Sequence, residues 1–243
     1  MKAKYNSSSG NKENKMNIPA STFGGRAADF FLNFTAAKRL PKNIRLMNPY
    51  ANGEVKEIVK EFYKKYFNDD NKRTLALGIN PGRFGGGITG VSFTDPVALE
   101  KYCGIQNSFD KKRELSSDFI YSFIAAFGSV KDFYSKFFIS ALYPLALIKD
   151  GLNYNYYDDQ RLFAALKPEI IRSIKAQMDF GASKDFVICL GRKNGIYLKK
   201  INDENKFFDK IILLDHPRYI MQYKRKSFEK YIDDYLAAFK SCT

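Results

Sequence analysis

The feature that most constrains the fold is one stretch, residues 75–93, in which an apolar run leads into a glycine-rich loop. The run covers residues 75–79, which is too short for a helix, and it stops at the polar Asn80. A short, uninterrupted apolar run followed by turn residues is typical of a buried strand in a parallel sheet. We therefore predict a strand that delivers a functional loop at its carboxyl end.

Five glycines lie within residues 82–90 of this loop. Glycine permits backbone geometry and close approach that a side chain would block, so the loop is expected to wrap tightly against something flat or phosphorylated. A Walker loop is excluded because no Gly-Lys-Ser/Thr follows. Gly85, Gly87 and Gly90 match the dinucleotide fingerprint, but the match starts late and residues 91–94 are not expected to open a helix, so we set that interpretation aside.

The loop resembles motif 1 of the uracil-DNA glycosylase superfamily, in the form of its single-strand-selective monofunctional branch. That form reads Gly-x-Asn-Pro-Gly-x-Phe-Gly and then Thr-Gly-Val-x-Phe, and ten positions within residues 78–93 match it. The matching residues are Gly78, Asn80, Pro81, Gly82, Phe84, Gly85, Thr89, Gly90, Val91 and Phe93. This pattern is far more specific than an isolated glycine motif.

Charge favours a polyanionic partner. The chain carries 40 Lys+Arg against 26 Asp+Glu, a net charge of +14 and a pI of about 9.5. Such an excess is typical of a protein that binds nucleic acid, although a solvated surface in a basic proteome is the alternative. The resemblance to the glycosylase superfamily implies that this partner is DNA, and we expect a monomer as the working form.

Length and composition predict one domain. The 243 residues suffice for a single α/β domain with a sizeable core. Residues 1–21 are rich in Ser, Asn, Lys and Gly and are predicted to be a mobile basic tail, which leaves residues 22–243 as the domain. No apolar segment reaches about eighteen residues, so neither a membrane span nor an export signal is expected.

Three cysteines, Cys103, Cys189 and Cys242, lie far apart in the chain. They form no paired spacing, so neither a disulfide framework nor a four-thiolate iron–sulfur cluster is expected. This favours a reducing cytoplasm. No cluster of metal-ligand spacing is present, and we predict no metal and no cofactor.

Three further apolar runs, residues 137–145, 185–191 and 211–215, are predicted strands separated by helical patterns. Alternating strands and helices indicate a three-layer α/β/α sandwich with a four-stranded parallel central sheet. Helices are expected over residues 26–38, 54–67, 116–127, 158–178 and 230–240, the fourth divided in two at Pro168. Asp95 before Pro96 reads as a helix cap rather than as a catalytic base.

The last predicted strand delivers His216, the only histidine in the chain. A lone histidine is more often a packing residue, but His216-Pro217 resembles motif 2 of the same superfamily, which ends the last strand and precedes a loop that enters DNA. In the superfamily, motif 2 continues as Ser-Pro-Arg-Asn. Residues 218–221 differ from that sequence here, so the wedge, meaning the residues that enter the DNA base stack, is expected to be particular to this chain. We predict Tyr219, Ile220 and Met221 as the residues that fill the vacated base stack, and Arg83, Arg218, Lys224 and Arg225 as phosphate contacts.

The middle strand departs from the resemblance. The amide that reads the pyrimidine edge in relatives aligns with Ala141, and the nearest hydroxyl is on Ser140, which can donate and accept. We predict Ser140 as a base contact. The lost amide leaves room for other deaminated bases such as xanthine or hypoxanthine.

The resemblance implies a site at the carboxyl ends of the strands, where ligands gather in such sheets. Cleaving an N-glycosidic bond leaves positive charge on the sugar and negative charge on the base. Asn80 would orient water at the sugar, and a neutral His216 would donate a hydrogen bond to the departing base. Gly82 and Phe84 would line the base pocket, while Phe93 would stack on the flipped ring.

The sequence therefore predicts a monofunctional DNA glycosylase that acts on uracil or a related deaminated base in base excision repair. The first alternative is a nucleic-acid-binding protein that keeps the fold but has lost excision, as the change at Ala141 and the altered wedge allow. The second alternative is a hydrolase for free nucleosides, which would turn over without polymer and with little salt sensitivity.

Overall fold

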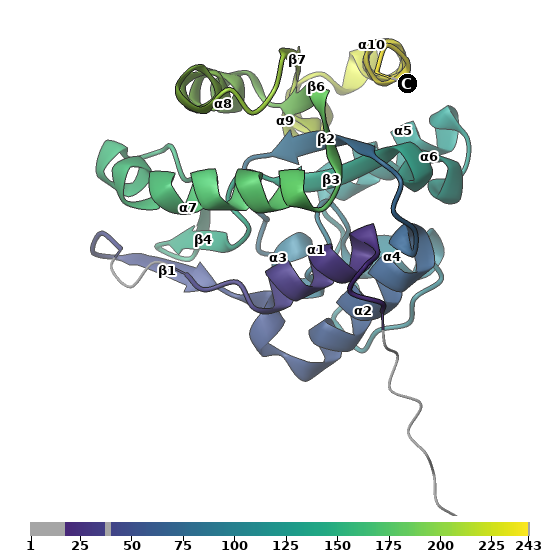
Figure 1. The fold of residues 1–243 in the computed structure, drawn as a ribbon, viewed down its shortest axis with the longest axis horizontal. Helices are drawn as coiled ribbons and strands as arrows, with labels where there is room; N and C mark the ends of the chain where they lie inside the picture. The colour runs from purple at the N-terminus through teal and green to yellow at the C-terminus, as the bar shows by residue number, and fades with distance from the viewer. Residues whose placement is uncertain (1–17, 37–39, 243) are drawn as a thin grey trace, which may run out of the picture.

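Four parallel strands form the central sheet of the computed structural model, which describes residues 18–36 and 40–242 (Figure 1). The strands lie in the order β3-β2-β6-β7, and every neighbouring pair is parallel. They are β2 (Arg73–Gly78), β3 (Phe137–Ala141), β6 (Ala182–Leu190) and β7 (Lys210–Leu214). All four predicted strands are present, and the predicted parallel sheet is confirmed.

Helices cover both faces of this sheet, with α7 and α8 on one side and α5, α6 and α10 on the other (Figure 1). Their bounds are α1 (Phe23–Leu32), α2 (Gly53–Phe67), α3 (Gly86–Thr89), α4 (Pro96–Lys101), α5 (Leu115–Phe127), α6 (Val130–Lys136), α7 (Gln160–Asp179), α8 (Arg192–Asn205), α9 (Pro217–Tyr223) and α10 (Phe228–Lys240), with short 3₁₀ turns η1 (Pro49–Ala51) and η2 (Arg225–Ser227). The predicted α/β/α layering is therefore correct.

A second, antiparallel sheet was not predicted. It has the order β1-β4-β5, with β1 (Ile44–Met47), β4 (Ala146–Lys149) and β5 (Leu152–Tyr154). Asp150 and Gly151 form the turn of the β4–β5 hairpin, both with a positive φ, at 49° and 74°. Strands of three or four residues leave little periodicity in the sequence, which explains the omission.

The predicted break at Pro168 is wrong, because α7 is one helix of 20 residues with Pro168 inside it. A proline removes one helical hydrogen bond and strains the preceding turn, at a cost of about 3 kcal/mol. An apolar stripe continues across the proline and offsets this cost. The stripe consists of Leu162, Leu166, Ile170 and Ile174, each fully buried.

One hydrophobic cluster extends from Phe23 near the start of the described chain to Phe239 in α10. This continuity supports our proposal that the predicted domain, residues 22–243, is a single unit. Residues 1–17 of the predicted tail lie outside the described residues, whereas Ile18 packs against the core. Among the helices in the described ranges, none is both long and apolar enough to cross a membrane.

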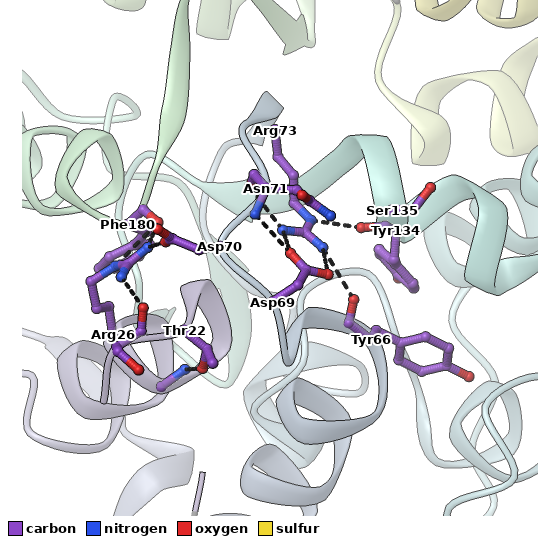
Figure 2. A network of polar contacts seen from close by, with 12 residues as sticks. Thr22, Arg26, Tyr66, Asp69, Asp70, Asn71, Arg73, Tyr134, Ser135 and Phe180 are labelled. Atoms are coloured by element: carbon purple, nitrogen blue, oxygen red, sulfur yellow. Dashed lines mark hydrogen bonds and ion pairs between the residues drawn. The ribbon is translucent and has the colours of Figure 1, made fainter. Parts of the chain in front are cut away.

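A buried arginine at the start of β2 joins three parts of the fold (Figure 2). The Arg73 side chain is fully buried, and its guanidinium donates to both carboxylate oxygens of Asp69, at 2.8 and 2.9 Å. It also donates to the Tyr134 carbonyl at 2.7 Å. The guanidinium carbon lies 4.9 Å from the ring centroids of Phe23 and Phe67. These contacts satisfy a charge that the apolar core would otherwise exclude.

We expect Arg73→Met to lower the free energy of unfolding by about 3 kcal/mol, because it leaves the Asp69 carboxylate and buried carbonyls without their donor. Urea denaturation measures this loss. The hydrogen bond from Arg73 holds the pKa of Asp69 below its usual range. Asp69 therefore stabilises the fold at pH values above the pKa that it has in the unfolded chain. The difference in free energy of unfolding between wild type and Arg73→Met should narrow as the pH falls through the lowered pKa of Asp69 in the folded protein.

Lys199→Met is the matched control, since Lys199 forms an exposed ion pair with Asp203 at 2.9 Å on α8. Exposed pairs of this kind contribute about 0.5 kcal/mol or less. If the two variants were destabilised equally, the buried contacts of Arg73 would stabilise the fold no more than an exposed ion pair does.

Candidate active site

A cavity of about 660 Å³ opens at the carboxyl ends of β2 and β7. Its wall is built by the loop after β2, by the start of α5, by β5 and by α9. Eight of the thirteen predicted site residues line it: Asn80, Gly82, Arg83, Phe84, Phe93, His216, Arg218 and Tyr219. Segments far apart in the sequence thus meet at one edge of the sheet, as parallel topology predicts.

Asn80 follows the end of β2 and is held by β5 and the turn after it. Its Nδ2 donates to the Tyr154 carbonyl and its Oδ1 accepts from the Tyr156 backbone N–H, both at 3.1 Å. An amide oxygen has two lone pairs, so one remains for a further donor in the cavity. The side chain therefore presents a carbonyl oxygen in a fixed direction.

The glycines of the loop are required by the packing of the protein itself. Backbone N–H groups of Gly85 and Gly87 donate to the Gly82 carbonyl, at 3.3 and 2.9 Å, and close a tight turn. A Cβ at Gly87 would lie 2.6 Å from that same carbonyl oxygen. The turn leads into α3, a helix of four residues that the sequence did not predict.

His216 follows β7 and caps α9, because its Nδ1 accepts from the Arg218 backbone N–H at 3.2 Å. The ring proton is therefore on Nε2. Burial, together with the positive charge of Arg218, lowers the pKa of His216 to about 4. At neutral pH the ring is uncharged and has one N–H to donate.

Phe93 lies beside this histidine, with 5.6 Å between the ring centroids and 39° between the ring planes. Its backbone is in the left-handed region, with a φ of 54°, which turns the chain sharply at this point. The ring also packs on Gly78, where an added Cβ would lie 2.5 Å from a ring carbon. This contact explains why the motif needs glycine at the end of β2.

Phe84 projects from the loop and is 37% exposed. The guanidinium carbon of Arg83 lies 4.6 Å from its ring centroid, and the ammonium of Lys112 lies 5.5 Å from it. Two cations on an aromatic ring at the cavity mouth form a surface suited to stacked bases and phosphates.

The structure does not bring Ser140 to the cavity. Ser140 is 1% exposed, and its Oγ is buried without a hydrogen-bond partner among the described residues. Successive side chains of a strand point to opposite faces, so Ala141 reaches the cavity wall and Ser140 points away from it. The predicted exchange of an amide for this hydroxyl is therefore not supported by the geometry.

The predicted wedge needs a correction as well. Residues 217–223 form α9 rather than an open loop, and Ile220 faces the core with 0% exposure. Met221 is half-buried against the core. The exposed aromatic rings are Tyr219, at 41%, and Tyr223, at 66%, whose centroids lie 5.6 Å apart.

The two remaining predicted phosphate contacts, Lys224 and Arg225, follow α9 and are exposed, outside the cavity wall. Asp95 also lies outside the wall and caps α4, where its Oδ1 accepts from the Ala98 N–H at 2.8 Å. The cap interpretation of Asp95 is confirmed.

Several wall residues were missed by the sequence analysis: Arg113, Glu114, Leu152, Asn153, Gln222 and Tyr223. Tyr223 could have been found, since it lies four positions after Tyr219 and therefore shares its helix face. Glu114 offers no such signal, because it precedes a packing helix and reaches the cavity only through the tertiary fold. Within residues 18–36 and 40–242, no group of three or more potential metal ligands comes together.

Comparisons with known proteins agree with this geometry. The sequence profile of the Uracil DNA glycosylase superfamily matches residues 64–240. Among solved structures, wild-type SMUG2 from Pedobacter heparinus is similar, with 44% sequence identity and a TM-score of 0.87. The similarity covers 90% of this chain and 97% of the SMUG2 chain. No curated protein sequence gives a significant match.

Proposed function

Because the chain belongs to the uracil-DNA glycosylase superfamily and is a DNA glycosylase, we propose that it hydrolyses the N-glycosidic bond of uracil, xanthine or hypoxanthine after flipping the base out of DNA. The main support for this proposal is that Asn80 and His216 line the same cavity. Hydrolysis of this bond needs a group at each end of it, one for the sugar and one for the base.

His216 acts on the base in this proposal. Its uncharged ring donates Nε2–H to a base carbonyl, and the hydrogen bond strengthens as the base departs as an anion. A cationic histidine is not needed, and the low pKa excludes it at neutral pH.

Asn80 acts on the sugar. Its Oδ1 has a free lone pair that orients a water molecule toward C1′ while positive charge develops there. An amide is no base at neutral pH, so positioning is its whole contribution, and the water loses its proton late, after the bond to the base has weakened.

The range of bases follows from the cavity wall. Ala141 gives the wall a methyl group where an amide would select one pyrimidine edge. A cavity of about 660 Å³ is large enough for a purine ring system. Both features support excision of xanthine and hypoxanthine in addition to uracil.

In duplex DNA, Tyr219 and Tyr223 would fill the space that the flipped base leaves. We expect Tyr223→Ala to slow excision from duplex DNA about tenfold, since aromatic stacking on a base contributes about 1–3 kcal/mol. Excision from single strands should change little, because no stack has to be filled. Single-turnover rates on matched single- and double-stranded substrates measure the difference, and an equal loss on both would argue against a wedge.

The experiment that tests the proposed substrates uses oligonucleotides with a single uracil, xanthine or hypoxanthine, in single- and double-stranded form. Alkali cleaves the strand wherever a base has been released, and gel separation of the fragments gives the yield for each base. Release of uracil and at least one of the two purines supports the proposal. Binding without release from any of the three would leave a DNA-binding protein and overturn it.

Action as a monomer and location in a reducing cytoplasm stay predictions. The free thiols of Cys103 and Cys189 in the core and of Cys242 near the C-terminus agree with a reducing compartment.

A further inference from the structure

Asn194, near the start of α8, is a buried amide at the carboxyl ends of two neighbouring strands. Its side chain is 0% exposed. Its Nδ2 donates to the Leu77 carbonyl in β2 at 3.2 Å and to the Leu190 carbonyl in β6 at 3.4 Å. Its Oδ1 accepts from the Tyr156 hydroxyl at 2.7 Å. Because both ends of the amide have partners, Asn194 joins β2, β6 and the turn after β5.

Tyr156 connects this amide to Asn80. Tyr156 is also 0% exposed, and its ring centroid lies 5.0 Å from that of Tyr157 and 5.8 Å from that of Tyr197. Its hydroxyl donates to Asn194, while its backbone N–H donates to Asn80 Oδ1 at 3.1 Å. The side chain of Tyr156 is therefore fixed in the core, and its main chain contacts the carbonyl that we assign to the attacking water.

The side chain of Asn80 is held by a short segment at the edge of the second sheet. Within residues 18–36 and 40–242, both hydrogen bonds of this side chain go to residues 154–156, at the end of β5. β5 has three residues and pairs with β4 at the edge of its sheet. A short edge strand has little stability of its own, so the bond between Tyr156 and Asn194 is a main support of this segment.

We propose that Tyr156 and Asn194 are positioning residues for the hydrolysis, which hold the Asn80 carbonyl in the direction that orients the attacking water. The contacts run from Asn194 to Leu77, along β2 to Asn80, and back through Tyr156 to Asn194, so they form a closed ring. Such a ring fixes the turn after β5 relative to β2. This inference rests on the proposed function and extends it to two residues outside the cavity wall.

The location of the two residues decides which step they affect. Neither side chain lines the cavity, so the affinity for DNA should not depend on the bond between them. The water that Asn80 orients has to stay in line with the sugar, and a displacement of about 1 Å in such a group costs about 10²-fold in rate. Loss of the Tyr156 hydroxyl should therefore slow base release and leave the affinity for DNA unchanged.

The test uses Tyr156→Phe, which removes the hydroxyl and keeps both the ring and the backbone N–H. The matched control is Tyr121→Phe, because the Tyr121 hydroxyl is also buried, with Thr94 Oγ1 at 2.9 Å and Cys103 Sγ at 3.1 Å. Neither Thr94 nor Cys103 lines the cavity. Thermal melting shows whether the two variants are destabilised to a similar extent.

Two measurements separate rate from affinity. Single-turnover kinetics on a single-stranded uracil oligonucleotide give the rate of base release. Fluorescence anisotropy with the same strand carrying 2′-fluoro-2′-deoxyuridine, which resists hydrolysis, gives the dissociation constant. We expect Tyr156→Phe to release uracil about tenfold more slowly with a dissociation constant within about twofold of wild type, and Tyr121→Phe to change neither by more than about twofold. A wild-type rate in Tyr156→Phe, or an equal loss of rate in both variants, would overturn the inference.

A double-mutant cycle with Asn80→Ala shows through which residue Tyr156 acts. Once the Asn80 carbonyl is gone, Tyr156→Phe has nothing left to misplace and should slow base release by less than about twofold more. A purely structural hydroxyl would instead slow both backgrounds by the same factor. An equal tenfold loss with and without the Asn80 side chain would therefore contradict a positioning role.

Hydrogen exchange of the Tyr156 backbone N–H, followed by NMR, adds a readout that needs no activity. Asn80 Oδ1 accepts this N–H, so exchange should be about tenfold faster in Tyr156→Phe than in wild type and unchanged in Tyr121→Phe. Unchanged exchange in Tyr156→Phe, with release of uracil at the wild-type rate, removes the inference and leaves the function. Faster exchange in Tyr156→Phe, when wild type releases none of the three bases, removes the function and leaves Tyr156 as a support of Asn80.

Discussion

His216→Asn is expected to release uracil about 10²–10³-fold more slowly than wild type, because it removes the donor that stabilises the departing base. Asparagine is a favoured helix cap, so the variant can still accept the Arg218 N–H at the start of α9. The fold is thereby preserved while the Nε2–H is lost. Single-turnover kinetics on a single-stranded uracil oligonucleotide measure the effect, with thermal melting as the check on folding.

The pH dependence of the rate of base release by wild type is a second test of His216. The pKa of His216 is lowered to about 4, so the ring is neutral above that value and becomes charged as the pH falls through it. Protonation of Nδ1 would break its bond with Arg218. The rate of base release by wild type should therefore decline below about pH 4. A rate for His216→Asn within about threefold of the wild-type rate at neutral pH would contradict the role of His216.

Asn80→Ala is expected to slow base release by about 10²-fold, because the attacking water loses the carbonyl that orients it. The same change also breaks the two hydrogen bonds that tie the loop to Tyr154 and Tyr156. A loss of rate from this variant thus has a structural and a chemical component.

Asn153→Ala separates the two components. The Asn153 Oδ1 accepts from the Arg83 backbone N–H at 3.0 Å, so this side chain also ties β5 to the loop. It lacks the position at the sugar that we assign to Asn80. The control should therefore lose less than about tenfold in rate, and an equal loss in both variants would reduce Asn80 to a structural role.

The central sheet was predictable because its strands are buried apolar runs, and burial leaves a plain signal in sequence. Asn80 and His216 were predictable for a related reason, since both follow such runs and parallel strands end at the same edge. β6 lies between β2 and β7, yet the two side chains still share one cavity. The resemblance to the glycosylase superfamily, which rested on the loop after β2, is confirmed by the sequence profile and the solved structure.

Two of the three predicted wedge residues, Ile220 and Met221, are not exposed as a wedge requires, because residues 218–221 were read as an open loop. In the helix that they form, successive residues turn by about 100°, so Ile220 points to the core and Tyr219 to solvent. The helical spacing of four brings Tyr223 beside Tyr219 instead. The prediction therefore chose the right segment but expected a loop where the chain forms a helix.

Glu114 shows what sequence reasoning cannot reach. The four residues before it are charged and exposed, and its contact with Gly82 and Gly85 depends on how closely the start of α5 approaches the loop after β2. Ser140 shows the converse, since its hydroxyl is adjacent in sequence to the right position and faces the wrong side of β3. Both cases depend on side-chain direction, which only the fold determines.

In the function that we propose, this chain hydrolyses the bond between a deaminated base and deoxyribose and leaves the strand whole. Mass spectrometry of a single-stranded oligonucleotide with one uracil, before and after incubation with the protein, tests it most directly. We expect an intact strand in which a hydroxyl replaces the base, together with free uracil, and no such product with His216→Asn. An unchanged oligonucleotide, or a strand broken at the uracil position by the protein itself, would contradict it.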